Sequence, residues 1–84
     1  MDQEKIIQEL KEIIAEIAEV EPEEIDLQTN FFDDLDMDSM SAIELVAWME
    51  KQYGMKISEE SLPSMVTLKG IMVLVTEHFS RSDG

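Results

Sequence analysis

The sequence contains no cysteine, so neither a disulfide framework nor a cysteine-ligated metal site supports the fold. It also lacks a long apolar run, because the longest, residues 71–75, is far shorter than the roughly 20 apolar residues of a membrane span. The N-terminal segment is charged and has no apolar stretch before a cleavage site, so we expect no signal peptide. These features predict a cytoplasmic protein that does not insert into a membrane.

Basic residues are also scarce. Six Lys and Arg stand against twenty Asp and Glu, which gives a net charge of −14. None of the six lies between Lys11 and Lys51, an interval that holds thirteen acidic residues. This charge argues against nucleic acid or an anionic membrane as a partner. Two interpretations remain for the acidic half: a solvated surface, or a docking face for basic partners.

The apolar pattern predicts helices and no strands. Stripes at helical spacing indicate helices over about residues 3–19 and 39–53, and a last helix that Thr67 caps. Gly54 is a stop for the second helix, and Gly70 weakens the last one by about 1 kcal/mol relative to Ala. A short helix follows Ser58, with Pro63 limiting its length.

The 84 residues fit one domain, predicted over residues 1–79, followed by a flexible C-terminal tail at residues 80–84. The fold class is all-α: a four-helix bundle of three longer helices and one short one, with a long loop at residues 20–37. A loop of this length in a small domain is usually functional or disordered. We expect an ordered loop, because five large apolar side chains can anchor it: Ile25, Leu27, Phe31, Phe32 and Leu35.

The helix that begins at Ser39 has two apolar faces. Its core stripe comprises Ala42, Leu45, Val46, Met49 and Tyr53. The opposite side should be polar, but Met40, Ile43 and Ala47 lie there among Glu44, Glu50 and Lys51. A small domain cannot pair buried acids on that side, so the second face is interpreted as an interaction surface. This favours docking as the role of the acidic half.

Ser39 itself lies at the N-terminal end of this helix. The positive end of the helix dipole suits an anion there, such as a phosphodiester on the hydroxyl. A serine at this position is more often simply a helix cap.

The stretch around Ser39 resembles the acyl carrier proteins, which typically show an aromatic residue, Asp-Leu-Gly-x-Asp-Ser-Leu and then Val/Ile-Glu-Leu. Phe31, Leu35, the pair Asp38-Ser39 and the run Ile43-Glu44-Leu45 match this pattern. The resemblance extends over nearly the whole chain. It implies a four-helix acyl-carrier-like fold and a carrier rather than an enzyme, so no catalytic residue and no metal site are expected.

Membership would imply that Ser39 receives 4′-phosphopantetheine from coenzyme A through a Mg²⁺-dependent phosphopantetheinyl transferase. The thiol of this arm then carries acyl groups as thioesters for fatty-acid, polyketide or specialised lipid biosynthesis. The partners are synthase enzymes with basic docking patches, and the carrier is expected to act as a monomer. The expected docking residues are Asp34, Asp36, Asp38, Met40, Ile43, Glu44, Ala47 and Glu50.

The sequence departs from the family pattern at several places. Asp36 stands where a glycine is common, and Met40 replaces the usual leucine. Ser41 and Lys51 occupy positions where acids are frequent. These changes remove part of the usual docking set and favour a specialised pathway over primary fatty-acid synthesis.

Parts of the sequence also suggest three other classes of protein. An aminoacyl or peptidyl carrier remains the alternative, because Asn30-Phe31-Phe32 resembles that type. Its serine usually follows Gly-Gly-His or Gly-Gly-Asp, however, and this chain has Asp36-Met37-Asp38, which favours an acyl cargo. An EF-hand-like calcium site starting at Asp34 would place Leu45 where a bidentate carboxylate is needed. A serine hydrolase would need a Gly-x-Ser-x-Gly elbow, which is missing around Ser39.

Overall fold

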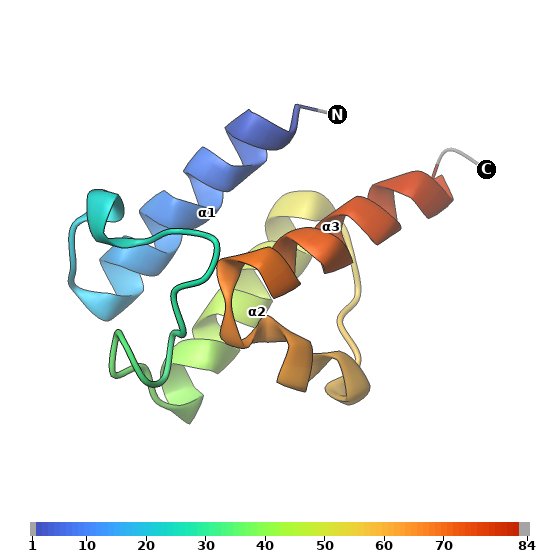
Figure 1. The fold of residues 1–84 in the computed structure, drawn as a ribbon. Coiled ribbons are helices and arrows are strands. Elements are labelled where there is room, and N and C mark those ends of the chain that lie inside the picture. Colours follow the sequence, from blue (N-terminus) through green and yellow to red (C-terminus); the bar gives the residue numbers. More distant parts are fainter. Residues whose placement is uncertain (1, 83–84) are drawn as a thin grey trace.

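The computed structural model describes residues 2–82, which form three α-helices and two 3₁₀ helices (Figure 1). The elements in chain order are α1 (Gln3–Ala18), η1 (Pro22–Glu24), α2 (Ser39–Tyr53), η2 (Glu59–Val66) and α3 (Leu68–Ser82). Within these residues the β-structure is limited to one isolated antiparallel bridge, between Asn30 and Thr67. The all-α prediction is confirmed, including the long loop between α1 and α2.

The helix ends follow local chemistry. The Asp2 carboxylate accepts a hydrogen bond from Lys5 N at 3.2 Å and so caps α1, which ends where Glu19 adopts a left-handed φ of 60°. Gly54 ends α2 in the same conformation, with φ 63°. Thr67 Oγ1 accepts from Gly70 N at 3.1 Å, which confirms the predicted cap of α3.

Two predicted boundaries need correction. Pro63 does not end the short helix, because η2 continues through it to Val66 and departs from helical geometry at Met65. The helix α3 continues to Ser82, so the boundary expected after residue 79 lies inside the helix. Residues 83 and 84 of the predicted tail lie outside the described residues, and its flexibility stays a prediction.

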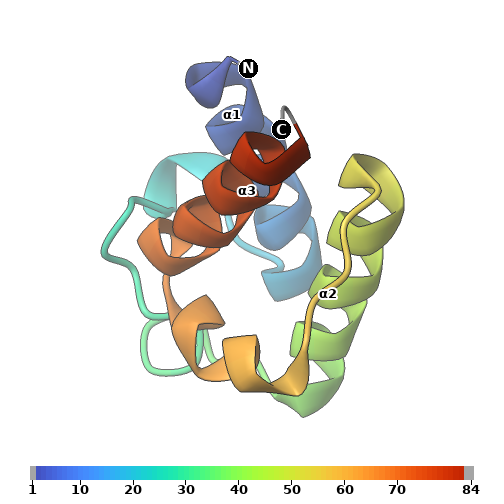
Figure 2. The same ribbon diagram turned by 90° about the vertical axis from the view of Figure 1, so that its right-hand side faces the viewer.

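The helices enclose one apolar core. The start of α1 and the ends of α2 and α3 gather at one end of the molecule, and the long loop closes the other (Figures 1 and 2). The predicted stripes supply most of the core, and methionines not predicted as core complete it. The core side chains are Ile6, Leu10, Ile14, Ala15, Ile25, Phe31, Met37, Leu45, Met49, Met55, Met65, Leu68, Ile71, Met72 and Val75.

A hydrogen bond and two edge-to-face ring contacts join the helices at one end of the molecule. Tyr53 Oη donates to Glu9 Oε1 at 3.0 Å and joins α2 to α1. Burial and this bond to a carboxylate raise the pKa of the Tyr53 hydroxyl, so it remains protonated well into alkaline solution. The ring also meets Trp48 and Phe79 edge to face, at centroid distances of 5.6 and 6.1 Å. These contacts lie at the end opposite the long loop.

The long loop is ordered, as predicted, but only some of its five anchors are buried. Ile25 and Phe31 are fully buried and Leu35 is half-buried, whereas Leu27 and Phe32 are exposed. Backbone hydrogen bonds add to the burial: Phe31 N donates to Val66 O at 2.8 Å. The loop is thus attached to the junction between η2 and α3 by both burial and backbone pairing.

Gly70 has a role that helix propensity does not indicate. A Cβ at this position would collide with the backbone carbonyl of Ser64 in η2, so the first turn of α3 and η2 approach too closely for any side chain. The expectation that Gly70 is only a weak point of α3 is therefore corrected. Its lack of a side chain permits the packing of η2 on α3.

We predict that Gly70→Ala destabilises the protein, although alanine favours helices. The propensity gain is about 1 kcal/mol, while forcing two backbone segments apart typically costs about 1–3 kcal/mol. Urea unfolding followed by circular dichroism measures the difference. Lys69→Ala, at the neighbouring exposed position, is the control and should change stability by less than about 0.5 kcal/mol. An increase in stability for Gly70→Ala would contradict the close approach.

Candidate functional site

The loop that leads into α2 is built from side-chain and backbone hydrogen bonds. Asp34 N donates to Asn30 O at 2.7 Å, and Asp34 Oδ2 accepts from Asn30 N at 2.8 Å. Met37 N donates to Phe31 O at 3.0 Å, and the Met37 side chain is buried. The last residues before α2 are therefore held against the core, which fixes where Ser39 begins the helix.

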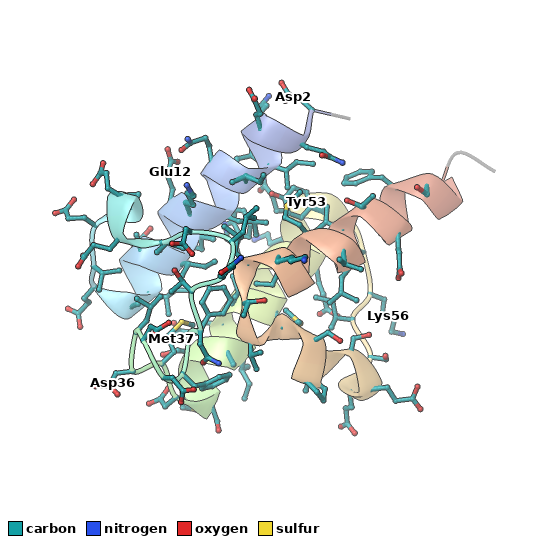
Figure 3. The ribbon with its side chains drawn as sticks, in the orientation of Figure 1. Asp2, Glu12, Asp36, Met37, Tyr53 and Lys56 are labelled. Atoms are coloured by element: carbon teal, nitrogen blue, oxygen red, sulfur yellow. The ribbon has the colours of Figure 1, made fainter. Side chains whose placement is uncertain are left out.

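Asp36 lies at the tightest point of this loop. Its φ is 57°, the left-handed region that side chains other than glycine rarely adopt. Figure 3 shows Asp36 directed away from the molecule, whereas its neighbour Met37 is a core residue. The conformation gives a physical reason why a glycine would suit this position.

Asp38, not Ser39, caps α2. The Asp38 carboxylate accepts from Ser41 N at 2.9 Å. Hydrogen bonds from the Ser41 backbone and side chain hold the pKa of Asp38 below its usual value of 3.8. The stabilisation it adds is therefore present above that value and is lost as the pH falls through the lower folded pKa.

Ser39 is therefore not required as a cap. It is the first residue of α2, it is exposed, and its hydroxyl makes no hydrogen bond to any part of residues 2–82. The interpretation of Ser39 as a helix cap is thus removed, and an accessible hydroxyl remains at the positive end of the α2 dipole.

The second apolar face of α2 is exposed, as predicted from the sequence. Met40 and Ile43 expose 68% and 62% of their surface, and Ala47 and Glu44 are exposed beside them. The opposite face packs in the core through Leu45 and Met49, with Ala42, Val46 and Tyr53 half-buried. The helix presents one side to the core and keeps the other free.

A largely apolar cavity of about 520 Å³ opens beside Ser39. Its α2 wall comprises Ser39, Ala42, Ile43, Leu45, Val46 and Glu50. The other walls come from the long loop and from the segment between α2 and α3: Phe31, Phe32, Met37, Ile57, Glu59, Leu62 and Met65. The volume lies within the range of about 300–1,000 Å³ found for small-ligand sites.

The residues outside α2 that line this cavity were not predicted as part of a site. Phe32 was expected to anchor the loop, but it is 40% exposed and lines the cavity. Leu62 is likewise 43% exposed. The sequence signal for this wall is the aromatic pair Phe31-Phe32, but only the fold shows that both rings line the cavity and that Phe31 alone is buried.

The expected docking acids differ in their surroundings. Asp36 and Glu44 are exposed, whereas Asp34 and Asp38 are exposed but use their carboxylates to hold the loop and cap the helix. Glu50 is half-buried, and its Oε2 accepts a hydrogen bond from Ile57 N at 2.9 Å. Glu50 thus combines a place in the cavity wall with a bond to the following loop.

Neither a membrane helix nor a metal cluster is found in the described chain. No helix in residues 2–82 is long and apolar enough to cross a membrane. In the same residues, no group of three or more acidic, histidine or cysteine side chains is placed to hold a metal ion. The carboxylates of Asp34 and Asp38 instead accept from separate backbone donors, so the EF-hand-like arrangement is not formed.

Comparison with known proteins gives a consistent result. Residues 8–72 match the family model described as "Phosphopantetheine attachment site". The chain is similar to the acyl carrier protein of Rhodococcus erythropolis, with 38% identity over 87% of this chain and 80% of that one. It is 40% identical to the meromycolate extension acyl carrier protein of Mycolicibacterium smegmatis, over 87% of this chain and 74% of the relative.

A solved structure shows the same fold. The acyl carrier protein from Enterococcus faecalis matches with a TM-score of 0.79 and 28% identity, covering 92% of this chain and 98% of that one. The fold of this chain is thus shared with a solved structure of similar size.

We predict that glycine at position 36 gives a more stable protein than alanine does, which is the reverse of their order within a helix. In the left-handed conformation a Cβ costs roughly 1–2 kcal/mol, so Asp36→Gly should be more stable than Asp36→Ala by about 1 kcal/mol. Thermal unfolding of both variants measures this difference. Ala47→Gly, on the exposed face of α2, is the matched control, where alanine is favoured by about 1 kcal/mol. Equal stability at position 36 would refute the left-handed assignment.

Proposed function

This chain belongs to the acyl carrier protein family, whose members carry a phosphopantetheine attachment site, and we propose that Ser39 is the residue that bears the arm. The observation that carries this proposal is the position of Ser39: an exposed hydroxyl at the start of α2 and beside an apolar cavity. Because Asp38 caps the helix, modification of Ser39 leaves the cap intact.

Attachment exchanges the phosphoanhydride bond of coenzyme A for a phosphate ester bond to Ser39. The Ser39 oxygen attacks the phosphorus that bears the pantetheine moiety of coenzyme A, the pyrophosphate bond breaks, and 3′,5′-ADP leaves. The serine proton passes to a base of the transferase, which also provides the Mg²⁺. The α2 N-terminus favours the resulting phosphodiester through its dipole. No residue of the carrier acts as a catalyst.

The residues around Ser39 fit a 4′-phosphopantetheine group and its cargo. When bound, the arm supplies a thiol that holds an acyl group as a thioester. The chain itself provides the exposed attachment point and an adjoining cavity lined mainly by Ala42, Ile43, Val46 and Leu62. An apolar lining of this kind shields an acyl chain from water. It offers few polar partners to an aminoacyl cargo, so we propose acyl groups as the substrate class.

We propose a specialised pathway rather than primary fatty-acid synthesis. Lys51 is exposed at the end of α2 where an acid is frequent in the family, and Ser41 replaces another acid. Several of the similar proteins are named for meromycolate extension, while others are named simply as acyl carrier proteins. The changed charges support recognition by a different set of enzymes.

The outer face of α2 is proposed as the surface that partner enzymes recognise. Met40, Ile43 and Ala47 supply exposed apolar contact, and Glu44 and Asp36 supply accessible negative charge. Asp34 and Asp38 add charge at the start of the helix. Acidic groups around a small apolar patch steer basic partners and allow rapid release, as a carrier that visits several enzymes requires. The net charge of −14 opposes self-association, so we propose that the carrier acts as a monomer.

We predict that the purified protein gains the mass of one phosphopantetheine arm when incubated with coenzyme A, Mg²⁺ and a broad-specificity transferase. Ser39→Ala should abolish the gain, because the attacking oxygen is lost. Ser41→Ala, two residues along the same helix, is the control and should still be modified. Intact-mass spectrometry reads all three. No gain in the unchanged protein, or a gain in Ser39→Ala, would refute the proposed attachment site.

We predict that Glu44→Lys slows loading by the transferase several-fold in kcat/KM and flattens its dependence on salt, because a charge that steers the encounter is reversed. Glu12→Lys makes the same charge change on α1, at an exposed position remote from α2 (Figure 3), and is the matched control. Loading rates are measured across a range of salt concentrations. Equal slowing by both variants would indicate an effect of net charge alone and would contradict a docking face on α2.

A further inference from the structure

Ser39 and Glu50, eleven positions apart, are the first and last residues of α2 that line the cavity. Eleven residues of helix advance about 16 Å and return to nearly the same side, within about 20°. Ser39 and Glu50 therefore lie on one stripe, with Ala42, Ile43 and Val46 between them, and all five line the cavity. The stripe begins at the attachment hydroxyl, is apolar in its middle and ends at a carboxylate.

Part of the facing wall comes from residues that follow α2 in the chain. Among the helical elements, α2 packs against α1 and η2 packs against α3, and α1 also contacts α3. The chain turns at Gly54, and the segment from residue 54 to 58 leads to η2 (Figure 2). Ile57 in that segment lines the cavity together with Leu62 and Met65. The α2 wall and the η2 wall of the cavity therefore belong to different helix pairs, which meet where α1 contacts α3.

Glu50 joins the two walls. Its Oε2 accepts from Ile57 N at 2.9 Å, in a part-buried position. A hydrogen bond with a charged acceptor is stronger than a neutral one, and breaking it would leave a half-buried N–H and carboxylate without partners. No other hydrogen bond connects α2 to the segment from 54 to 58 within residues 2–82. On the α2 wall, this bond lies at the end remote from Ser39.

We propose that Glu50 is a specificity-determining residue: through its bond to Ile57 it ends the cavity and sets the longest acyl chain that the carrier encloses. This rests on the proposed function, in which Ser39 bears the acyl arm. Each added methylene gains from burial while it meets apolar lining. Beyond the apolar stripe the chain meets a hydrogen-bonded carboxylate, and it advances only if that bond opens. Carbons of the acyl chain beyond this length then remain in solvent or push the two cavity walls apart.

This assignment separates Glu50 from the docking acids. Glu44 lies on the same helix but is exposed, and its carboxylate accepts no hydrogen bond from residues 2–82. Glu50 is half-buried, with one oxygen committed to Ile57. The two acids thus permit a matched comparison between a carboxylate that closes the cavity and one that faces solvent.

The experiment loads the protein with saturated acyl chains that lengthen in two-carbon steps and measures the melting temperature of each acylated form relative to its own unacylated, arm-bearing form. For the unchanged protein, the stabilisation should rise with chain length and then level off. In Glu50→Ala it should level off at least one two-carbon step later, because the closing bond is lost. Glu50→Gln keeps an acceptor for Ile57 N and should level off where the unchanged protein does. Glu44→Ala should also leave the limit unmoved.

Hydrogen exchange of the Ile57 amide provides a second measurement that requires no variant. In the unchanged protein, this amide should exchange about tenfold faster once the acyl chain exceeds the limiting length. The faster exchange reports opening of the bond between Ile57 N and Glu50. In Glu50→Ala the fast exchange should be present with every chain, and in Glu50→Gln it should not.

The outcomes are distinct. A limit that stays in place in Glu50→Ala, a stabilisation independent of chain length, or Ile57 exchange unaffected by long chains would each overturn the role of Glu50. If the alanine variant does not fold, the exchange measurement on the unchanged protein decides. Failure to load any arm onto Ser39 would instead refute the proposed function itself, and intact mass distinguishes that result before any chain length is compared.

Discussion

The attachment of the long loop to the junction of η2 and α3 is the constraint on which the rest of the molecule depends. Phe31 buries its ring in the core while its backbone N–H bonds to Val66 O at 2.8 Å. The same residue accepts from Met37 N and so holds the final turn of the loop. Without this attachment the chain before α2 would have no fixed path, and neither Ser39 nor the cavity beside it would be defined. A loop of this length is ordered because it combines buried side chains with paired backbone groups.

Because the loop fixes the start of α2, Asp38 and Ser39 have different roles there. Asp38 satisfies the helix terminus through Ser41 N, and its neighbour Ser39 is left exposed with an uncommitted hydroxyl. Leu45 and Met49 hold the helix in the core, which leaves the opposite face free for partners. A carrier needs this combination, because its attachment point must be rigidly placed yet accessible to several enzymes. The charge of the chain then acts over distance, whereas the apolar patch acts only at contact.

Several expectations from the sequence were changed by packing. Phe31 and Phe32 are chemically identical neighbours that both line the cavity, yet Phe31 is fully buried and Phe32 is exposed. Gly70 appeared only as a weak helix former until its contact with the Ser64 carbonyl was known. Met37, Met55 and Met65 join the core although no periodic pattern marked them. In each case the deciding contact is made with another segment of the chain, which local periodicity does not specify.

The sequence by itself determined the helical class, the two-faced character of α2, the acidity and the resemblance that singled out Ser39, because these depend on local spacing and composition. The tertiary structure alone decided that Asp38 is the cap, that Asp36 adopts a left-handed conformation, and that a cavity opens beside Ser39. It also decided that Glu50, which the pattern groups with the docking acids, bonds to Ile57 instead. The reason is physical: periodicity specifies the face of a helix on which a side chain lies, but not the distant segment that the fold brings against that face.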